Sequence, residues 1–152
     1  MNTVTISERV AKVRRPLGRD EKFFFIGAID MAAVLVAGFA LNLAMGRSTF
    51  ASPIRFHIHA FLFFGWTALF LTQNTLAVTG SLALHRRLGW LATVWVPLMV
   101  VSGIYMTVAD IRGGRVPPFF APAYFLVMNP LQILCFAGLV LAAITRRRRT
   151  QW

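Results

Sequence analysis

Cysteine, acidic residues and the common catalytic motifs are scarce or missing in this chain. One of its 152 residues is a cysteine, Cys135, and five are Asp or Glu. A lone cysteine excludes an intrachain disulfide and a Cys-rich zinc site. The sequence also lacks the glycine-rich phosphate loop, the nucleophile elbow and the HExxH zinc motif. We therefore expect no metal site and no enzyme of the classes that these motifs mark.

Charge is low overall, and apolar residues dominate. Only 14% of the residues are charged and 57% are hydrophobic, whereas soluble domains are about 25% charged. Four apolar stretches reach the length of about 20 residues that a helix needs to cross a bilayer: residues 23–45, 56–79, 88–109 and 119–145. Backbone polar groups must be paired in lipid, so each stretch should be a helix. The sequence predicts an all-α, up-and-down, four-helix membrane bundle over residues 23–145, between basic tails at 1–22 and 146–152.

The basic residues predict the orientation of this bundle. Of the 16 Lys and Arg, 12 lie in the N-terminal tail, the second connection and the C-terminal end, and 4 lie in the other two connections. Lys and Arg favour the cytoplasmic side, so both termini should be cytoplasmic in a multi-pass protein of the bacterial inner membrane. The net charge of +11 follows the ends of the apolar runs. It therefore indicates contact with anionic lipids of the inner leaflet and no nucleic-acid partner.

The N-terminal tail contains a short amphipathic pattern. Thr5 and Glu8 fit a capping box, and Ile6, Val10 and Val13 share one helical face. Two readings stay open, namely a helix lying on the inner leaflet and a frayed basic tail. The run of arginines at 146–149 is most simply an anchor for the topology.

Polar residues at matched depth predict an inner layer. Asp30 lies about 10 Å below the start of the first span, because a helix rises 1.5 Å per residue. Gln73, Asn74 and Thr93 lie at similar depth on the second and third spans. A carboxyl group in lipid should face the bundle interior, where it either meets a donor or stays protonated. The layer predicts either a proton-handling or ligand-binding site or a structural hydrogen bond between helices.

The second span carries a polar stripe. His59, Trp66 and Gln73 are each seven residues apart, which places them on one helical face that should contact protein. Such a face is either a packing seam or part of a site. In the fourth span, Asn129, Pro130 and Gln132 interrupt the apolar run, and interruptions of this kind can line a cavity.

Histidine and methionine leave one haem arrangement open. His57 and His59 point about 200° apart on a helix, so they cannot share a metal ion. His59 and Met106 lie at similar depth on different spans, and His/Met ligation of a haem b iron is a known mode. No haem is expected as the leading hypothesis, because a methionine in an apolar span usually fills space.

The middle of the chain resembles a family of uncharacterised small bacterial four-helix membrane proteins. The resemblance covers roughly residues 56–103 and rests on His59, Trp66, Gln73, Leu76, "HRRLGW" at 85–90 and "VSG" at 101–103. It is similar in style to four-helix b-type cytochromes but lacks their second pair of histidines. The resemblance implies a four-helix membrane fold and draws attention to His59, Trp66, Gln73 and His85, without implying a reaction. Together with His85, the basic pair Arg86 and Arg87 should lie in an inner loop near lipid headgroups.

These features favour a non-catalytic role. The leading hypothesis is a small accessory subunit or a binder of a lipid- or quinone-sized ligand. The alternatives are a single-haem or quinone-linked redox protein and a small oligomeric transporter, the latter based on Asp30 and on kinks at Pro97 and Pro130. Other membrane subunits or further copies of the chain are the expected protein partners.

Overall fold

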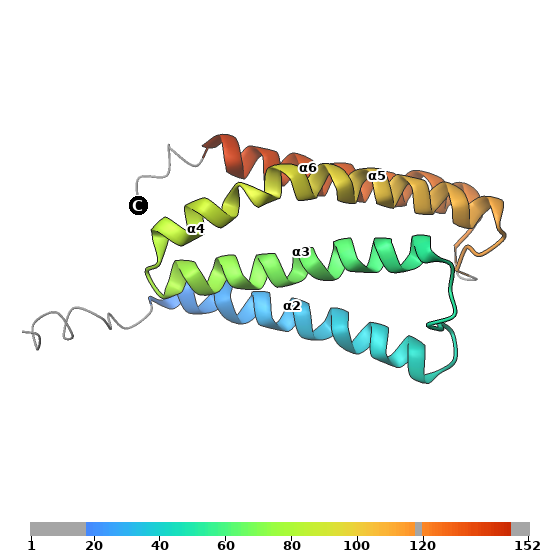
Figure 1. The fold of residues 1–152 in the computed structure, drawn as a ribbon, viewed down its shortest axis with the longest axis horizontal. Helices are drawn as coiled ribbons and strands as arrows, with labels where there is room; N and C mark the ends of the chain where they lie inside the picture. The colour runs from blue at the N-terminus through green and yellow to red at the C-terminus, as the bar shows by residue number, and fades with distance from the viewer. Residues whose placement is uncertain (1–17, 118–119, 147–152) are drawn as a thin grey trace, which may run out of the picture.

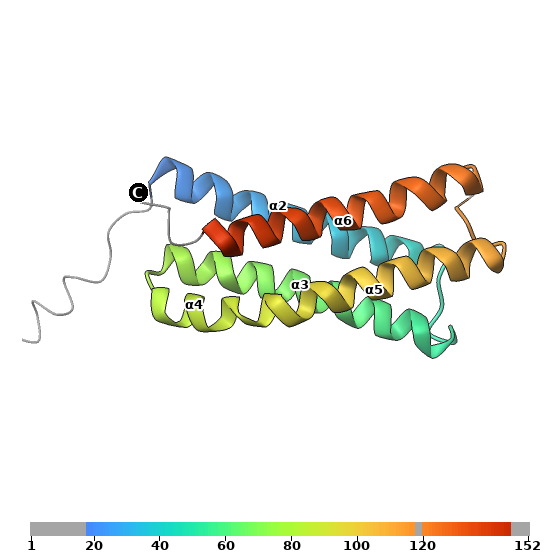
Figure 2. The same ribbon diagram turned by 90° about the horizontal axis from the view of Figure 1, so that it is seen from above.

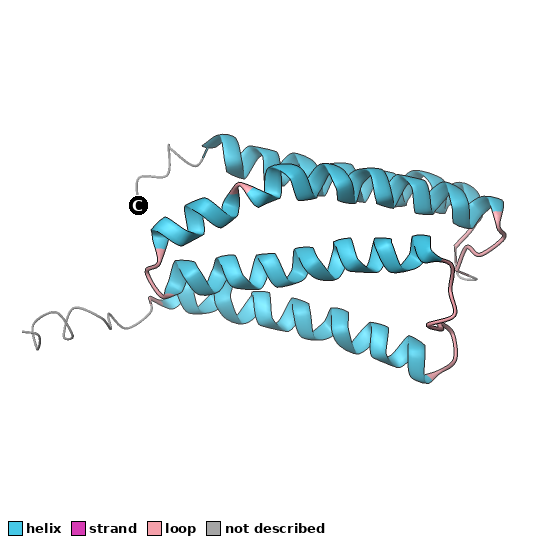
Figure 3. Ribbon diagram, viewed as in Figure 1, coloured by secondary structure: helices cyan, strands magenta, loops and turns pink. Residues whose placement is uncertain are grey.

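The computed structural model of the chain describes residues 18–117 and 120–146. Every regular element in these ranges is a helix (Figure 3). In chain order the helices are α2 (Arg19–Ala44), α3 (Ile54–Val78), α4 (Leu82–Gly89), α5 (Leu91–Arg112) and α6 (Pro122–Arg146). The predicted all-α class is confirmed for this part of the chain.

Four helical units are long and apolar enough to cross a membrane. They are α2, α3, α6 and the unit Leu82–Arg112 that α4 and α5 form together. Their outer surfaces are apolar, and Val34 and Leu139, for example, are each 73% exposed. Soluble monomers rarely show so much contiguous apolar surface, whereas lipid accommodates it. The helices thus have the length and the surface of a multi-pass membrane protein.

The helices run up and down in two pairs, with α2 and α3 beside α5 and α6 (Figures 1 and 2). α3 packs against both α2 and α5, and α5 packs in turn against α6. Within the described ranges, α2 packs against α3 alone. Consequently α2 and α6 do not pack against each other, and the bundle is open on the side between these two helices.

One end of the bundle gathers both ends of the described chain. The start of α2, the connection from α3 to α4 and the end of α6 all lie there (Figure 1). We call it the terminal end, and we call the opposite end, which carries the connections from α2 to α3 and from α5 to α6, the far end. The predicted up-and-down order of four spans agrees with this arrangement.

The prediction of a loop around residues 80–87 is wrong, because residues 82–89 form α4. Gly80 has a φ of +78°, a conformation that favours glycine, and it ends the α3 helix. The following segment "LALHRRLG" contains Leu, Ala and Arg, which are good helix formers, and no proline. His85, Arg86 and Arg87 are therefore helical residues, and α4 leads directly into α5.

The first helix begins at Arg19, four residues before the predicted start at residue 23. The carboxylate of Glu21 accepts a hydrogen bond from the Gly18 backbone N–H over 2.7 Å. Asp20 and Glu21 also lie in the first turn, where negative charge stabilises a helix. The predicted capping box of Thr5 and Glu8, like most of the arginine run at the C-terminus, lies outside the described residues.

Buried residues concentrate on α5. Its buried positions are Ala92, Val96, Met99, Gly103, Met106 and Thr107. α2 buries only Ala28 and Ala32, whose small side chains allow the close approach of another helix. α5 is therefore the best-covered helix, and α2 is attached along a narrow strip of its surface.

Candidate functional site

A cavity of about 330 Å³ lies between the four spanning helices. Its lining comes from all of them: Leu35 on α2; His59, Phe63, Trp66 and Thr67 on α3; Met99 and Gly103 on α5; and Asn129, Gln132, Ile133 and Phe136 on α6. Ligand sites in proteins commonly enclose about 300–1,000 Å³. The cavity is therefore large enough for the ring system of a lipid-soluble molecule.

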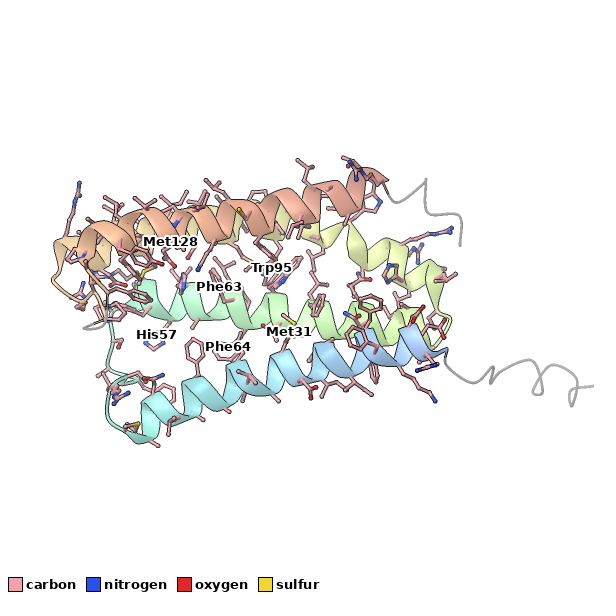
Figure 4. All side chains as sticks on the ribbon, turned by 180° about the vertical axis from the view of Figure 1, so that it is seen from behind. Met31, His57, Phe63, Phe64, Trp95 and Met128 are labelled. Carbon is pink, nitrogen blue, oxygen red and sulfur yellow. The ribbon has the colours of Figure 1, made fainter. Side chains whose placement is uncertain are left out.

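Aromatic rings form the walls of this cavity. The rings of Trp66 and Phe136 meet edge to face with centroids 5.1 Å apart, across the space between α3 and α6. The imidazole of His59 lies 4.3 Å from the ring of Phe63. Phe63 and Trp95 lie between α3 and the α5–α6 pair, whereas Phe64 points to the α2 side (Figure 4), where it meets Phe39. Rings held by their neighbours in this way favour a flat ligand.

His59 is fixed by a hydrogen bond between helices. Its Nδ1 atom lies 3.0 Å from the hydroxyl oxygen of Ser102 on α5. This contact orients the imidazole and leaves Nε2 as the ring nitrogen for a ligand. Nε2 either donates or accepts, depending on which nitrogen carries the proton.

Asn129 is fixed by a second chain of hydrogen bonds. Its amide donates to the hydroxyl of Thr107 over 2.6 Å, and that hydroxyl donates to the carbonyl oxygen of Gly103 over 2.8 Å. Thr107 is only 1% exposed. Since buried polar groups need partners, this chain ties α5 to α6 and holds the Asn129 side chain at the cavity wall.

The remaining polar groups of the lining are neutral. The hydroxyl of Thr67 donates to the Phe63 carbonyl oxygen, and Gln132 makes no hydrogen bond to any described residue. No Asp, Glu, Lys or Arg is among the described residues that line the cavity. A buried charge without a partner is costly, so this lining suits a neutral ligand with hydrogen-bonding atoms.

The polar stripe of α3 is divided between two places. His59 and Trp66 line the cavity, as a site on this face requires. Gln73 lies nearer the terminal end, and its side-chain nitrogen and oxygen are buried without a hydrogen-bond partner in the described structure. The imidazole Nδ1 of His85 lies 3.2 Å from the Gln73 backbone oxygen, so α4 folds back over this end of α3.

The other residues of the predicted inner layer are not brought together. Asp30 is exposed on α2, because the buried Ala28 and Ala32 lie two residues away on either side, about 200° around the helix. Asn74 donates to the carbonyl oxygen of Phe70, and Thr93 donates to that of Trp90. Each side chain therefore bonds to a nearby backbone carbonyl instead of to another polar side chain of the predicted layer.

The two residues considered for haem ligation differ in their surroundings. His59 lines the cavity, whereas Met106 is 5% exposed and is not among its lining residues. The methionine at the cavity is Met99. In the described ranges, no group of three His, Cys, Asp or Glu side chains is placed to hold a metal ion.

Several residues at the site were not identified as site residues from the sequence. Ser102 and Thr107 hold His59 and Asn129 in place, and Phe136 lines the cavity. Each of the three is a common residue in an apolar span. A usable signal existed on α5, where Met99, Gly103 and Thr107 are spaced four residues apart on one face. Asp110 follows the predicted end of the third span at residue 109, but it lies on the last turn of α5 and its carboxylate pairs with Arg115 over 3.6 Å.

Protein-family models, curated proteins and solved structures give no match to this chain.

Proposed function

We propose that this chain is a non-catalytic, multi-pass protein of the bacterial inner membrane that binds a neutral, lipid-soluble ligand of quinone size. The cavity between the four helices carries the proposal, because its volume, aromatic walls and uncharged polar groups match such a ligand. A charged ligand would find no counter-charge in this lining.

Both termini are proposed to be cytoplasmic. The distribution of basic residues in the sequence supports this orientation, since 12 of the 16 Lys and Arg belong to the N-terminal tail, the second connection and the C-terminal end. Arg86 and Arg87 are exposed at the end of α4. In this orientation they lie at the headgroups of the inner leaflet and contact anionic lipids.

The other hypotheses have less support. Haem ligation by His59 and Met106 has less support because Met106 does not line the cavity beside His59. A Soret band that disappears in His59→Ala and shifts in Met106→Leu would favour it. The transporter hypothesis is based on Asp30 and on kinks at Pro97 and Pro130. It has less support because Asp30 is exposed on α2 and does not line the cavity. An accessory role within a larger membrane assembly is compatible with the proposal, because α2 leaves most of its surface uncovered.

The proposal is tested by filling the cavity. Ile133 lines it, and the next residue, Leu134, is 52% exposed on the outside of α6. Ile133→Trp should place a large ring in the ligand space, whereas Leu134→Trp adds the same ring to the lipid-facing surface. The wild type and both variants are purified from membranes, extracted with organic solvent and compared by mass spectrometry.

A neutral lipid or quinone should co-purify in near-stoichiometric amount with the wild type and with Leu134→Trp, and should be lost from Ile133→Trp. The melting temperatures of the three proteins show whether Ile133→Trp is still folded. If the folded Ile133→Trp retains the same extract as the wild type, the ligand does not occupy this cavity and the proposal is wrong.

A further inference from the structure

A second, smaller cavity adjoins the first along α6. It encloses about 80 Å³ and is lined by Phe120, Tyr124, Phe125, Met128, Asn129 and Gln132. Asn129 and Gln132 also line the larger cavity. The two cavities are therefore adjacent and share this pair of amide side chains.

The two cavities form one strip along α6. Phe125, Asn129, Gln132 and Phe136 recur at intervals of three or four residues, which places them on one face of the helix. At 1.5 Å per residue, the eleven steps from Phe125 to Phe136 span about 16 Å. This length exceeds that of a single ring and suits an elongated molecule.

The chemistry changes along this strip. The larger cavity offers the imidazole of His59, the walls of Trp66 and Phe136 and the amide side chains of Asn129 and Gln132. The smaller cavity is lined mainly by apolar and aromatic side chains near the start of α6, where the rings of Phe120 and Tyr124 stack with centroids 5.7 Å apart. The strip thus has a ring-sized end with hydrogen-bonding groups and a narrow apolar end.

Building on the proposed function, we propose that the ligand has two parts: a quinone-type ring in the larger cavity and an apolar chain that passes Asn129 and Gln132 into the smaller cavity. The carbonyl oxygens of the ring accept hydrogen bonds from the Gln132 amide and from the second N–H of Asn129. The first N–H of Asn129 is already donated to Thr107. The chain runs toward the far end, past Met128 and Tyr124.

The proposed position of the ligand's apolar chain is tested by measuring the binding of two quinones to the full-length protein in detergent. A methoxy-methyl-benzoquinone without a chain is compared with the same ring carrying a decyl chain. Equilibrium dialysis against protein-free micelles removes the contribution of micelle partitioning. The wild type should bind the decyl compound at least about tenfold more tightly, because methylene groups buried in the smaller cavity add affinity.

Substitutions at two neighbouring positions on α6 distinguish binding of the ligand's apolar chain from binding of its ring. Met128 lines the smaller cavity, whereas Val127 is 63% exposed and lines neither cavity. Met128→Trp should remove the preference for the decyl compound and leave binding of the chainless ring unchanged. Val127→Trp should keep the wild-type values for both compounds.

Failure of this inference is distinct from failure of the proposed function. If the wild type binds both compounds equally, or if Met128→Trp keeps the decyl preference, the chain does not use the smaller cavity, while the ring can still bind. If neither compound binds above the micelle background, the proposed ligand class itself is wrong. Should Met128→Trp not fold, the affinity of the wild type is measured for quinones with alkyl chains of increasing length. The affinity should rise with chain length and then level off once the smaller cavity is full; an affinity that does not depend on chain length would contradict the inference.

Discussion

Trp95 of α5 lies across Gly65 of α3, and its indole Nε1 donates a hydrogen bond over 2.8 Å to the carbonyl oxygen of Leu62, one turn earlier on α3. A side chain at position 65 would collide with the six-membered part of the indole ring. The pair therefore sets how closely α3 and α5 approach. Since both helices wall the cavity, it also sets the width of the cavity.

Gly65→Ala should destabilise the bundle. The added methyl group displaces the Trp95 ring, and overpacking of this kind costs about 1–3 kcal/mol. Gly38 on α2 is the matched control, because nothing lies within 4 Å of a Cβ placed there. Gly38→Ala should be neutral or should stabilise by about 0.5–1 kcal/mol, as in an ordinary helix interior. Chemical unfolding of both variants in detergent tests this difference, and equal effects would show that the Trp95 contact does not limit the interface.

Thr107→Val should weaken the contact between α5 and α6. The substitution keeps the shape of the side chain but removes the hydroxyl that joins Asn129 to Gly103. Hydrogen bonds between membrane helices contribute about 0.6–1.7 kcal/mol, so a loss of this size is expected. Thr145→Val is the control, because that exposed hydroxyl bonds only to its own helix. If both variants unfold at the same denaturant concentration as the wild type, the chain of hydrogen bonds contributes nothing to stability.

The sequence was sufficient for the helices and their order, because four apolar runs of bilayer length leave few alternatives. It was less informative about which face of each helix meets protein. His59 and Trp66 were identified by their spacing on a helix that is covered on several sides. Asp30 was expected to face inward because of the cost of its charge, yet the helix that carries it packs on one neighbour through Ala28 and Ala32.

The unidentified site residues show why the rest could not be read from the sequence. Ser102 and Thr107 matter because of what faces them on α3 and α6, and contacts between distant segments leave no trace in local periodicity. The helical form of residues 82–89 was also missed, since a short basic segment between two apolar runs resembles a loop in composition.

Asp30→Leu should not destabilise the isolated protein in detergent. Asp30 is exposed and makes no hydrogen bond or ion pair with a described residue, so its removal leaves no buried group without a partner. In a membrane the change should favour insertion of α2, because a central Asp costs about 2.5–3.5 kcal/mol on insertion scales. Asp30→Asn is the control that keeps the shape and the polarity. A lower melting temperature for Asp30→Leu than for Asp30→Asn would reveal a polar partner for this carboxyl group.

The proposed orientation is tested with a reporter that is active only in the periplasm. Fused after Trp152 it should be silent, and inserted beside Arg112 at the far end it should be active. The reason is the excess of Lys and Arg in the N-terminal tail, the second connection and the C-terminal end of the sequence. The opposite pattern would invert the bundle in the membrane and place the smaller cavity nearer the cytoplasmic side.

The most direct measurement of the central claim uses Trp66 as a reporter of its own cavity. Trp66 is one of four tryptophans and lines the ligand space, and quinones quench indole fluorescence on contact. The protein in lipid nanodiscs is titrated with the decyl benzoquinone, beside Trp66→Phe, which keeps an aromatic wall, and His59→Ala, which removes a polar contact. We expect a saturable quenching component in the wild type, its absence in Trp66→Phe and a weaker affinity in His59→Ala. Quenching that never saturates, and that is the same in the wild type and Trp66→Phe, would contradict binding in this cavity.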